Sequence, residues 1–473
     1  MSDFEALLKQ LPSLKKLIDT SGDMSLFEYA SEMYHGVYDT SPLFLSRKRE
    51  FLDFIWRYVG QKFDSLMGKI VVEGLQKNYA ISTAEHHGPM WHPFFFQSAL
   101  LRAITRPYQP VINFATSHVS LGNSSYPRGL VFHAQNNKEE RRNNKAGIDC
   151  SDNKQNELNQ LNALNSTYLR LPFFGSKLRM CPVFRLPAYT REDIENHCLW
   201  RLKFYLREWS VTEEIYQKIL SFICDQVLDP KILAYSSYSE QITALNQSWW
   251  KELFSESPAY IPLDAEEMVI ALLEKHLQEE TIIGRMITDV SLQSIIEEQF
   301  DGISCCFNRA KKRGTYLFWY LDEEHKRHTL WRKWDALCTE DGSLSIRMNK
   351  DDILASLHAG ALIPSGLLVY TLFSCYYGIA CFGGFAQGEY LPQIQKAYWD
   401  LLWVLSESQK QLSTQWSILN EDMVFLYEKT WEISTALDRV VKNIPFADIL
   451  EASKSVSVSS SIQKMYYEIA RCL

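Results

Sequence analysis

The segment from 79 to 118 constrains the fold more than any other part of the sequence. A short apolar run, Tyr79–Ser82, leads into a turn that contains a glycine, and Pro93 then opens a run with helical character. Residues Pro110–His118 (PVINFATSH) predict a buried strand, and Leu130–His133 predicts a second one. The order strand, glycine-bearing turn, helix, strand is typical of an α/β nucleotide-binding unit. We therefore expect an α/β fold.

The remainder of the chain is expected to be mainly helical. The exceptions are a break at 255–264 (SESPAYIPLD) and a β-hairpin within 303–332. Residues 135–165 are mostly Asn, Gln and charged residues, which predicts a surface insertion. The expected parts are a helical N-terminal segment (1–78), a first part of the α/β core (79–190) with a polar insertion (135–165), a helical insertion (191–300), a second part of the core (301–395) and a helical C-terminal segment (396–473).

Composition excludes several classes of partner. The chain has 473 residues and a net charge of −8, whereas binding to nucleic acid needs a concentrated basic surface. No apolar run is long enough to span a membrane, and the first residues do not have the pattern of a signal peptide. The ten cysteines are scattered without a CxxC pair, as expected in a reducing compartment. We expect a cytoplasmic protein that binds neither nucleic acid nor membrane.

The richest group of candidate functional side chains lies in ISTAEHHGPMWHPFFFQ, residues 81–97. Imidazole nitrogens and carboxylate oxygens can bind zinc or manganese, and a histidine can also act as an acid or base near neutral pH. No compact motif such as HExxH occurs, so a metal-free polar pocket is favoured over a metal site, and a capped turn is the third interpretation. The candidates for acid–base or anion-binding roles are His86, His87, His92 and, on the next strand, His118.

Two glycine-bearing segments are expected to form opposite walls of one pocket. Gly88 stands between a strand and a helix, where backbone N–H groups and the helix N-terminus can hold an anion. The pair Gly383-Gly384 would allow a similar close approach from the other side, and Gln387 and Tyr390 would follow it on a helix. The predicted substrate-binding residues are Thr83, Glu85, Gly88, Gly383, Gly384, Gln387 and Tyr390.

Glu85-His-His-Gly-Pro89 is similar to the first motif of the creatininase family of metal amidohydrolases, Glu-Gln-His-Gly-Pro. The resemblance covers these positions only, because the later Gly-His-Gly-Gly-Asn motif of that family is missing. It implies a metal-dependent amidohydrolase in which Glu85, His87, His92 and His118 would bind the metal. We keep this as an alternative and predict no metal ligand.

A second resemblance extends over about 300 residues. Thr83-Ala-Glu-His-His-Gly88, four residues and then Pro93 resemble the motif Thr-Gly-Gln-Gln-Pro-Gly, four residues and proline of the bacillithiol synthases, a family regarded as cysteine ligases. Gly383-Gly-Phe-Ala-Gln387-Gly-Glu-Tyr390-Leu-Pro-Gln393 is similar to a later motif of that family at Gly383, Gly384, Tyr390 and Gln393. The chain departs from the family where Glu85 and His86 replace two glutamines, and where the acidic residues expected after the second strand are missing.

This resemblance implies a Rossmann-like, nucleotidyltransferase-type core. It also implies a small-molecule biosynthetic enzyme with ligase-like or group-transfer chemistry that forms a C–N bond on an amino-acid-like or polar substrate. The implied partner is a small-molecule substrate, and a nucleotide is the candidate cofactor. A non-catalytic protein that keeps the fold for binding remains a further alternative.

Overall fold

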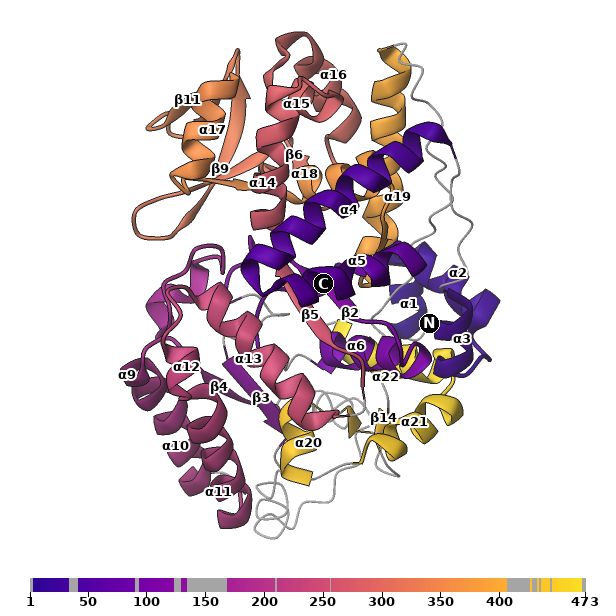
Figure 1. Ribbon diagram of the computed structural model, residues 1–473, viewed down its shortest axis with the longest axis vertical. Helices are drawn as coiled ribbons and strands as arrows, with labels where there is room; N and C mark the ends of the chain where they lie inside the picture. Colours follow the sequence, from indigo (N-terminus) through magenta and orange to yellow (C-terminus); the bar gives the residue numbers. More distant parts are fainter. Residues whose placement is uncertain are drawn as a thin grey trace, which may run out of the picture.

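The centre of the molecule is a parallel sheet of four strands in the order β13-β1-β2-β5, flanked by helices (Figure 1). The strands are β1 (Ala80–Ser82), β2 (Val111–Ala115), β5 (Tyr260–Asp264) and β13 (Ala380–Phe382). The prediction of an α/β fold is therefore confirmed. The computed structural model describes residues 3–33, 41–89, 93–122, 129–133, 168–208, 211–255, 257–405, 426–427, 432–433, 435–442 and 445–469.

The strand order of this sheet reverses at β1. The chain passes from β1 to β2 and then to β5 on one side, and it returns to β13 on the other side of β1. Every pair is parallel, with Ser82 opposite Phe382 at the end of β1 and β13. All four strands therefore end at the same edge. In open sheets of this kind, ligands bind outside the carboxyl ends of the strands beside such a reversal.

One face of the sheet packs against a large apolar core. Phe51 is fully buried there, and its ring lies 5.1–6.3 Å from the rings of Tyr79, Phe114, Phe373 and Tyr377. The helices of this side are α4 (Pro42–Lys62), α5 (Ser65–Lys77), α14 (Ala265–Gln278), α15 (Ile282–Thr288), α16 (Val290–Phe300), α18 (Gly366–Tyr370) with its π-helical continuation η4 (Thr371–Tyr376), and α19 (Phe385–Val404).

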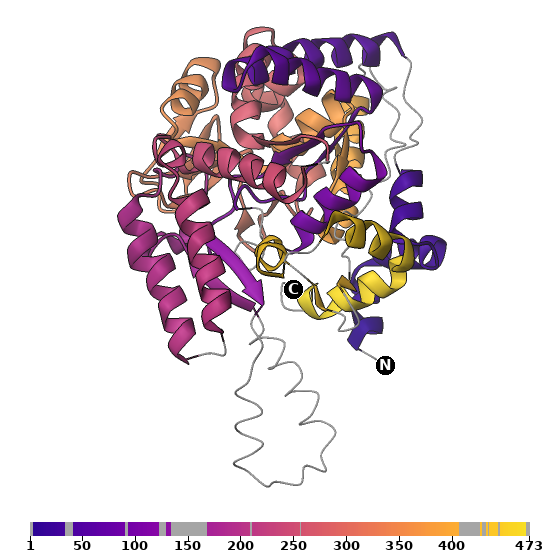
Figure 2. The ribbon, with the colours of Figure 1, turned by 60° about the horizontal axis from the view of Figure 1, so that its bottom comes forward.

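The opposite face packs against a second core, to which Val111 and Tyr260 contribute. It is covered by α1 (Asp3–Gln10), α2 (Pro12–Ser21), α3 (Leu26–Met33), α6 (Pro93–Thr105), α13 (Tyr238–Leu253), α20 (Ala436–Lys442), α21 (Phe446–Ser455) and α22 (Val458–Ile469). The first and last helices lie side by side (Figures 1 and 2), and the N–H of Val458 donates to the carbonyl of Met24 at 2.9 Å. The two ends of the chain therefore close over the same face.

The strand predicted at Leu130–His133 forms outside the parallel sheet. It is β3 (Gly129–His133), which pairs antiparallel with β4 (Tyr168–Pro172) in a separate hairpin. Figure 2 shows this hairpin beside a pair of helices. The neighbouring elements are η1 (Ser176–Met180), α9 (Arg191–Asp193), η2 (Ile194–Leu199), α10 (Trp200–Glu208), α11 (Glu213–Phe222), η3 (Ile223–Val227) and α12 (Pro230–Leu233).

The break expected within the helical range 191–300 is a strand of the central sheet. It is β5, which pairs with β2 along its whole length and brings Pro262 opposite Asn113. Proline cannot donate a ladder hydrogen bond, so it is confined to edge strands, and β5 is at the edge. The expected break in the helices therefore contains a strand of the core, and the description of 191–300 as one helical insertion is wrong there, because the chain rejoins the core at β5.

A second sheet is antiparallel, in the order β11-β10-β9-β8-β12. The hairpin predicted within 303–332 is confirmed by β8 and β9. Leu330 and Leu337 of this sheet are buried in the same core as Ile81 and Phe114. Its strands are β8 (Phe318–Leu321), β9 (Arg327–Lys333), β10 (Ala336–Thr339), β11 (Ser345–Arg347) and β12 (Leu362–Pro364), and α17 (Lys350–His358) lies between β11 and β12 in the chain. The strands β6 (Phe307–Asn308) and β7 (Arg313–Gly314) form a separate antiparallel hairpin.

A further pair, β14 (Leu426–Tyr427) and β15 (Glu432–Ile433), is antiparallel. None of the helices described is both long and apolar enough to cross a bilayer. The polar insertion expected at 135–165 and His92 lie outside the described residues.

Candidate functional site

The loops that follow β1 and β13 begin side by side at the carboxyl edge of the sheet. Because β1 and β13 are neighbours, the N–H of Thr83 donates to the carbonyl of Phe382 at 2.7 Å. The hydroxyl of Thr83 lies 3.0 Å from Oε1 of Gln387, to which it can donate. Residues about 300 positions apart are thus joined by their side chains at the point where the strand order reverses.

Both polar atoms of the Gln387 side chain form hydrogen bonds within the protein. Its Oε1 also accepts from the hydroxyl of Tyr370 at 3.0 Å, and its Nε2 donates to the carbonyl of Cys381 at 3.2 Å. The side chain is 3% exposed and fills the space over Gly383, where an added Cβ would lie 1.8 Å from Oε1. The room that the glycine leaves is therefore occupied by Gln387. Gly384 follows as the N-cap residue of α19.

Glu85 lies buried further along the loop after β1. Its Oε2 accepts a hydrogen bond from Nδ2 of Asn113 at 3.1 Å and another from the hydroxyl of Tyr260. Because Asn113 belongs to β2 and Tyr260 to β5, this one carboxylate ties the loop to two neighbouring strands. Its oxygens are engaged within the protein, which fits a structural role better than binding of a substrate.

Polar residues on one face of α13 hold the rest of this loop. Ser239, Thr243 and Asn246 are spaced so that they lie on the same side of the helix, and all are buried. Nε2 of His87 lies 3.0 Å from the hydroxyl of Ser239, and Nδ2 of Asn246 donates to the carbonyl of Gly88 at 2.8 Å. Burial lowers the pKa of His87 to about 4, so the imidazole is neutral near pH 7.

His118 and Glu266 form an ion pair at the ends of β2 and β5. Nδ1 of His118 lies 2.5 Å from Oε1 of Glu266, and the side chains are 15% and 0% exposed. Burial acts to raise the pKa of Glu266, but the charge of His118 and hydrogen bonds from His118 and Ser117 outweigh it and lower this pKa. The carboxylate is therefore charged and accepts the Nδ1 proton of the imidazole, so that in the neutral form of His118 the basic nitrogen is Nε2.

A second buried carboxyl group, Asp264, lies beside this pair. The hydroxyl of Ser117 is 2.8 Å from Oδ1 of Asp264 and 2.9 Å from Oε2 of Glu266, so it bridges the two. Burial, followed by the negative charges of Glu267 and Glu266, raises the pKa of Asp264 well above its ordinary range. Two neighbouring carboxyl groups thus have pKa values moved in opposite directions, an arrangement that suits acid–base chemistry.

Arg327, which belongs to β9 of the second sheet, lies beside the pair of His118 and Glu266. Nη1 of Arg327 donates to the backbone carbonyl of His118, and the guanidinium lies 3.9 Å from the ring centre of Trp319. Burial lowers the pKa of Arg327 to about 10, so the group stays positively charged at neutral pH. An anionic substrate at this edge would meet His118 and Arg327 together.

Two further predicted site residues, His86 and Tyr390, lie near the groups described above. His86 pairs with Thr116 in a parallel bridge that extends the ladder beyond β1 and β2. Burial, assisted by the nearby charge of His118, lowers the pKa of His86 to about 4. The hydroxyl of Tyr390 donates to that of Tyr370 at 3.0 Å, which links it to Gln387.

The structure therefore brings Thr83, Gln387 and Tyr390 together in one network, and His86 near His118 in another. Glu85, His87 and Gly88 are attached to α13, β2 and β5 instead. Within the described residues, no group of three or more His, Cys, Asp or Glu side chains is arranged to hold a metal ion. His92 lies outside the described residues.

Sequence reasoning missed the partners of His118. Glu266 and Asp264 come from the motif YIPLDAEE, whose carboxylates directly follow a strand. The family resemblance implies acidic residues after β2, and the sequence lacks them at that position. In the structure, acidic residues occupy the end of the neighbouring strand β5.

Comparison with protein-family models gives no match for this chain, and comparison with curated proteins gives none either.

Proposed function

We propose that this protein is an enzyme that binds a small polar, amino-acid-like substrate at the carboxyl edge of its parallel sheet, with His118 as its general base. The observation that carries this proposal is the pair of His118 and Glu266, in which a buried carboxylate orients an imidazole at the edge where sheets of this type bind ligands. Ser117 donates its backbone N–H to Glu266 at 2.6 Å and thereby fixes the orienting group.

In this proposal, Nε2 of His118 removes a proton from an amine of the substrate. The amine nitrogen forms a C–N bond to an electrophilic carbon of a second substrate, and the leaving group of that carbon departs with the bonding electron pair. Arg327 holds an anionic group of the amine-bearing substrate beside His118. Ligase-like or group-transfer chemistry that forms a C–N bond follows from the resemblance to bacillithiol synthases, as do a Rossmann-like, nucleotidyltransferase-type core and a nucleotide as the candidate cofactor. The reversal of strand order at β1 supports such a core. The eight cysteines among the described residues that are free thiols support a cytoplasmic location.

The test is a binding screen with amino acids, thiols and nucleotides, followed by calorimetry on the compounds that bind. We expect at least one of them to bind the unaltered protein and to bind His118→Gln much more weakly. If a reaction is found, Glu266→Gln should lower its rate about 100-fold or more, the size of an acid–base contribution.

The matched control is His328→Gln. His328 forms a similar pair with Asp322, with Nε2 and Oδ2 2.7 Å apart, but its side chain is 45% exposed on the second sheet. Binding and turnover should be unchanged in this variant. If a ligand binds the His118→Gln and Glu266→Gln variants as tightly as the unaltered protein, the proposed site is wrong. A bound ligand without turnover would favour the non-catalytic alternative.

A further inference from the structure

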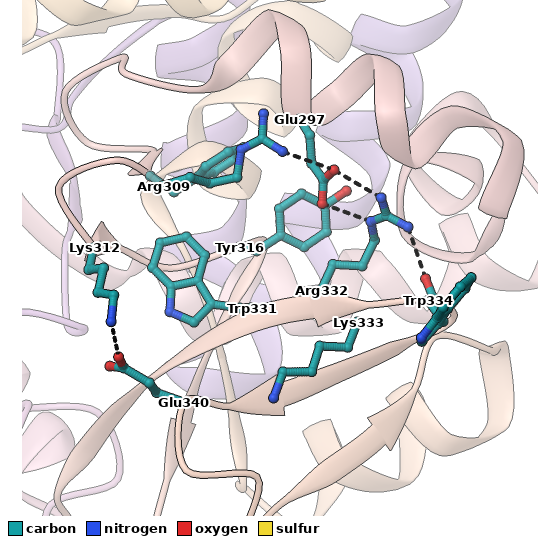
Figure 3. A pocket seen from close by; sticks show the side chains of 10 residues that line it. Glu297, Arg309, Lys312, Tyr316, Trp331, Arg332, Lys333, Trp334 and Glu340 are labelled. Carbon is teal, nitrogen blue, oxygen red and sulfur yellow. Dashed lines mark hydrogen bonds and ion pairs between the residues drawn. The ribbon is translucent and has the colours of Figure 1, made fainter.

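A second site lies on the antiparallel sheet, apart from the carboxyl edge of the parallel one. It is a cavity of about 450 Å³, a size common for small-molecule sites, between β9, the β6–β7 hairpin and α16. Figure 3 shows its wall of aromatic rings and long basic side chains. The lining residues are Glu297, Phe307, Arg309, Lys312, Tyr316, Trp331, Arg332, Lys333, Trp334 and Glu340.

The charge of this cavity is opposite to that of the whole chain. Four lining residues are cationic and two are anionic, whereas the protein has a net charge of −8. Glu297 is saturated by Arg332, which donates from Nε at 2.8 Å and from Nη2 at 2.9 Å, and by Arg309 at 3.3 Å. Arg309 also pairs with Asp301 at 3.0 Å. The two guanidinium groups are therefore balanced and fixed in place, and the charge available to a ligand is that of the lysines.

These lysines are open to an incoming anion. Lys312 and Glu340 form a pair at 2.6 Å whose side chains are 71% and 64% exposed, and such surface pairs are weak. Lys333 is exposed and makes no ion pair within the described part of the chain. An anion could therefore bind here without breaking a buried interaction.

The aromatic groups of the cavity favour a flat ligand. Phe307 and Tyr316 pack edge to face at its base, with ring centres 5.3 Å apart, and the ring of Trp331 stands among the cations in Figure 3. Trp334 is 88% exposed and has a φ of 60°, a backbone conformation that a bulky residue rarely adopts. A tryptophan there gains neither burial nor a relaxed backbone, which points to contact with another molecule.

We propose that this cavity binds a small anion that carries a flat ring and has the size of a mononucleotide. The phosphate would be held by Lys312 and Lys333, and the ring would stack on Trp331 or Trp334, as bases stack on aromatic side chains regardless of sequence. This site is independent of the proposed function, because it shares no residue with the pair of His118 and Glu266.

The experiment is a calorimetric titration of the full chain with AMP at low salt, with adenosine and inorganic phosphate as competitors. AMP should bind, and both competitors should displace it only at higher concentrations, because each supplies one half of the interaction. Lys312→Gln with Lys333→Gln should weaken AMP binding about tenfold or more, as expected when two complementary charges are lost. Binding should also weaken as salt is added.

The charge-matched control is Lys69→Gln with Lys396→Gln, whose side chains are 69% and 77% exposed and do not line the cavity. This control should bind AMP as the unaltered protein does. Trp331→Leu and Trp334→Asn test the rings separately. At least one of them should weaken the binding of AMP, and neither should change the binding of phosphate. Trp334→Asn retains a residue that tolerates a positive φ if Trp331→Leu does not fold.

Three results would overturn the proposal. The first is an absence of AMP binding at millimolar concentration, or a control variant, Lys69→Gln with Lys396→Gln, that loses as much AMP affinity as Lys312→Gln with Lys333→Gln. The second is AMP binding that His118→Gln abolishes and the lysine variants do not, which would place the nucleotide at the edge of the parallel sheet. The third is a single-stranded oligonucleotide that binds the same residues much more tightly than AMP, because the ligand would then be a nucleic acid.

Discussion

His87 is a buried side chain whose protonation should affect the stability of the protein. It is fully buried, and its folded-state pKa is about 4, whereas the ordinary value is 6.5. Between these pH values the unfolded chain binds a proton that the folded chain does not, so stability falls as the pH is lowered from about 6.5 to about 4. The loss from this one residue is about 3 kcal/mol over the whole window.

We expect His87→Gln to reduce the slope of unfolding free energy against pH in this window by about one proton. Urea denaturation at pH 7, 6 and 5 measures that slope. His358→Gln is the control, because its imidazole is 59% exposed, and the slope should then equal that of the unaltered protein. An unchanged slope in His87→Gln would mean that His87 is charged in the folded protein.

At the scale of elements, the contact between the loops after β1 and β13 depends on Gly383 and on the side-chain amide of Gln387. A Cβ at Gly383 would lie 1.8 Å from Oε1 and 2.2 Å from Cδ of Gln387. We therefore expect Gly383→Ala to destabilise the protein by about 1–3 kcal/mol through overpacking. Gln387→Ala should also destabilise it, because the hydroxyls of Thr83 and Tyr370 lose a buried acceptor.

The two substitutions should not add. Gln387→Ala removes the atoms that the methyl group introduced by Gly383→Ala would meet. The double variant should therefore be more stable than the sum of the single effects predicts, by about 1 kcal/mol or more. Urea unfolding of the four proteins gives this coupling. Strict additivity would show that the clash at Gly383 is relieved by movement elsewhere.

How far the sequence predicts the fold also differs from element to element. β1 and β2 are short apolar runs on either side of a helix, and such local patterns are sufficient to place them. β5 contains Pro262 and ends at Asp264, so its local pattern resembles a loop, and only its pairing with β2 makes it a strand. The same limit applies to the candidate site. Thr83 and Gln387 were identified from motifs, but Glu266 was not, because its position beside His118 follows from that pairing about 150 residues away.

At the scale of the whole molecule, the two cores share one thin sheet. In β2, Val111 packs into one core while Ile112 and Phe114 pack into the other. The second sheet has no separate core of this size among the described residues, because Leu337 is buried with the residues that cover β1 and β2. Neither core can therefore lose its packing without exposing the strands against which the other core packs.

This arrangement predicts a single cooperative unfolding transition. Leu245→Ala in α13 and Leu337→Ala in β10 each create a cavity in a different core, since both side chains are fully buried. Each should destabilise the protein by about 2–5 kcal/mol and shift the whole transition. Circular dichroism and tryptophan fluorescence should report the same midpoint in each variant. If one variant moves only part of a biphasic curve, the two cores unfold separately and the shared sheet does not couple them.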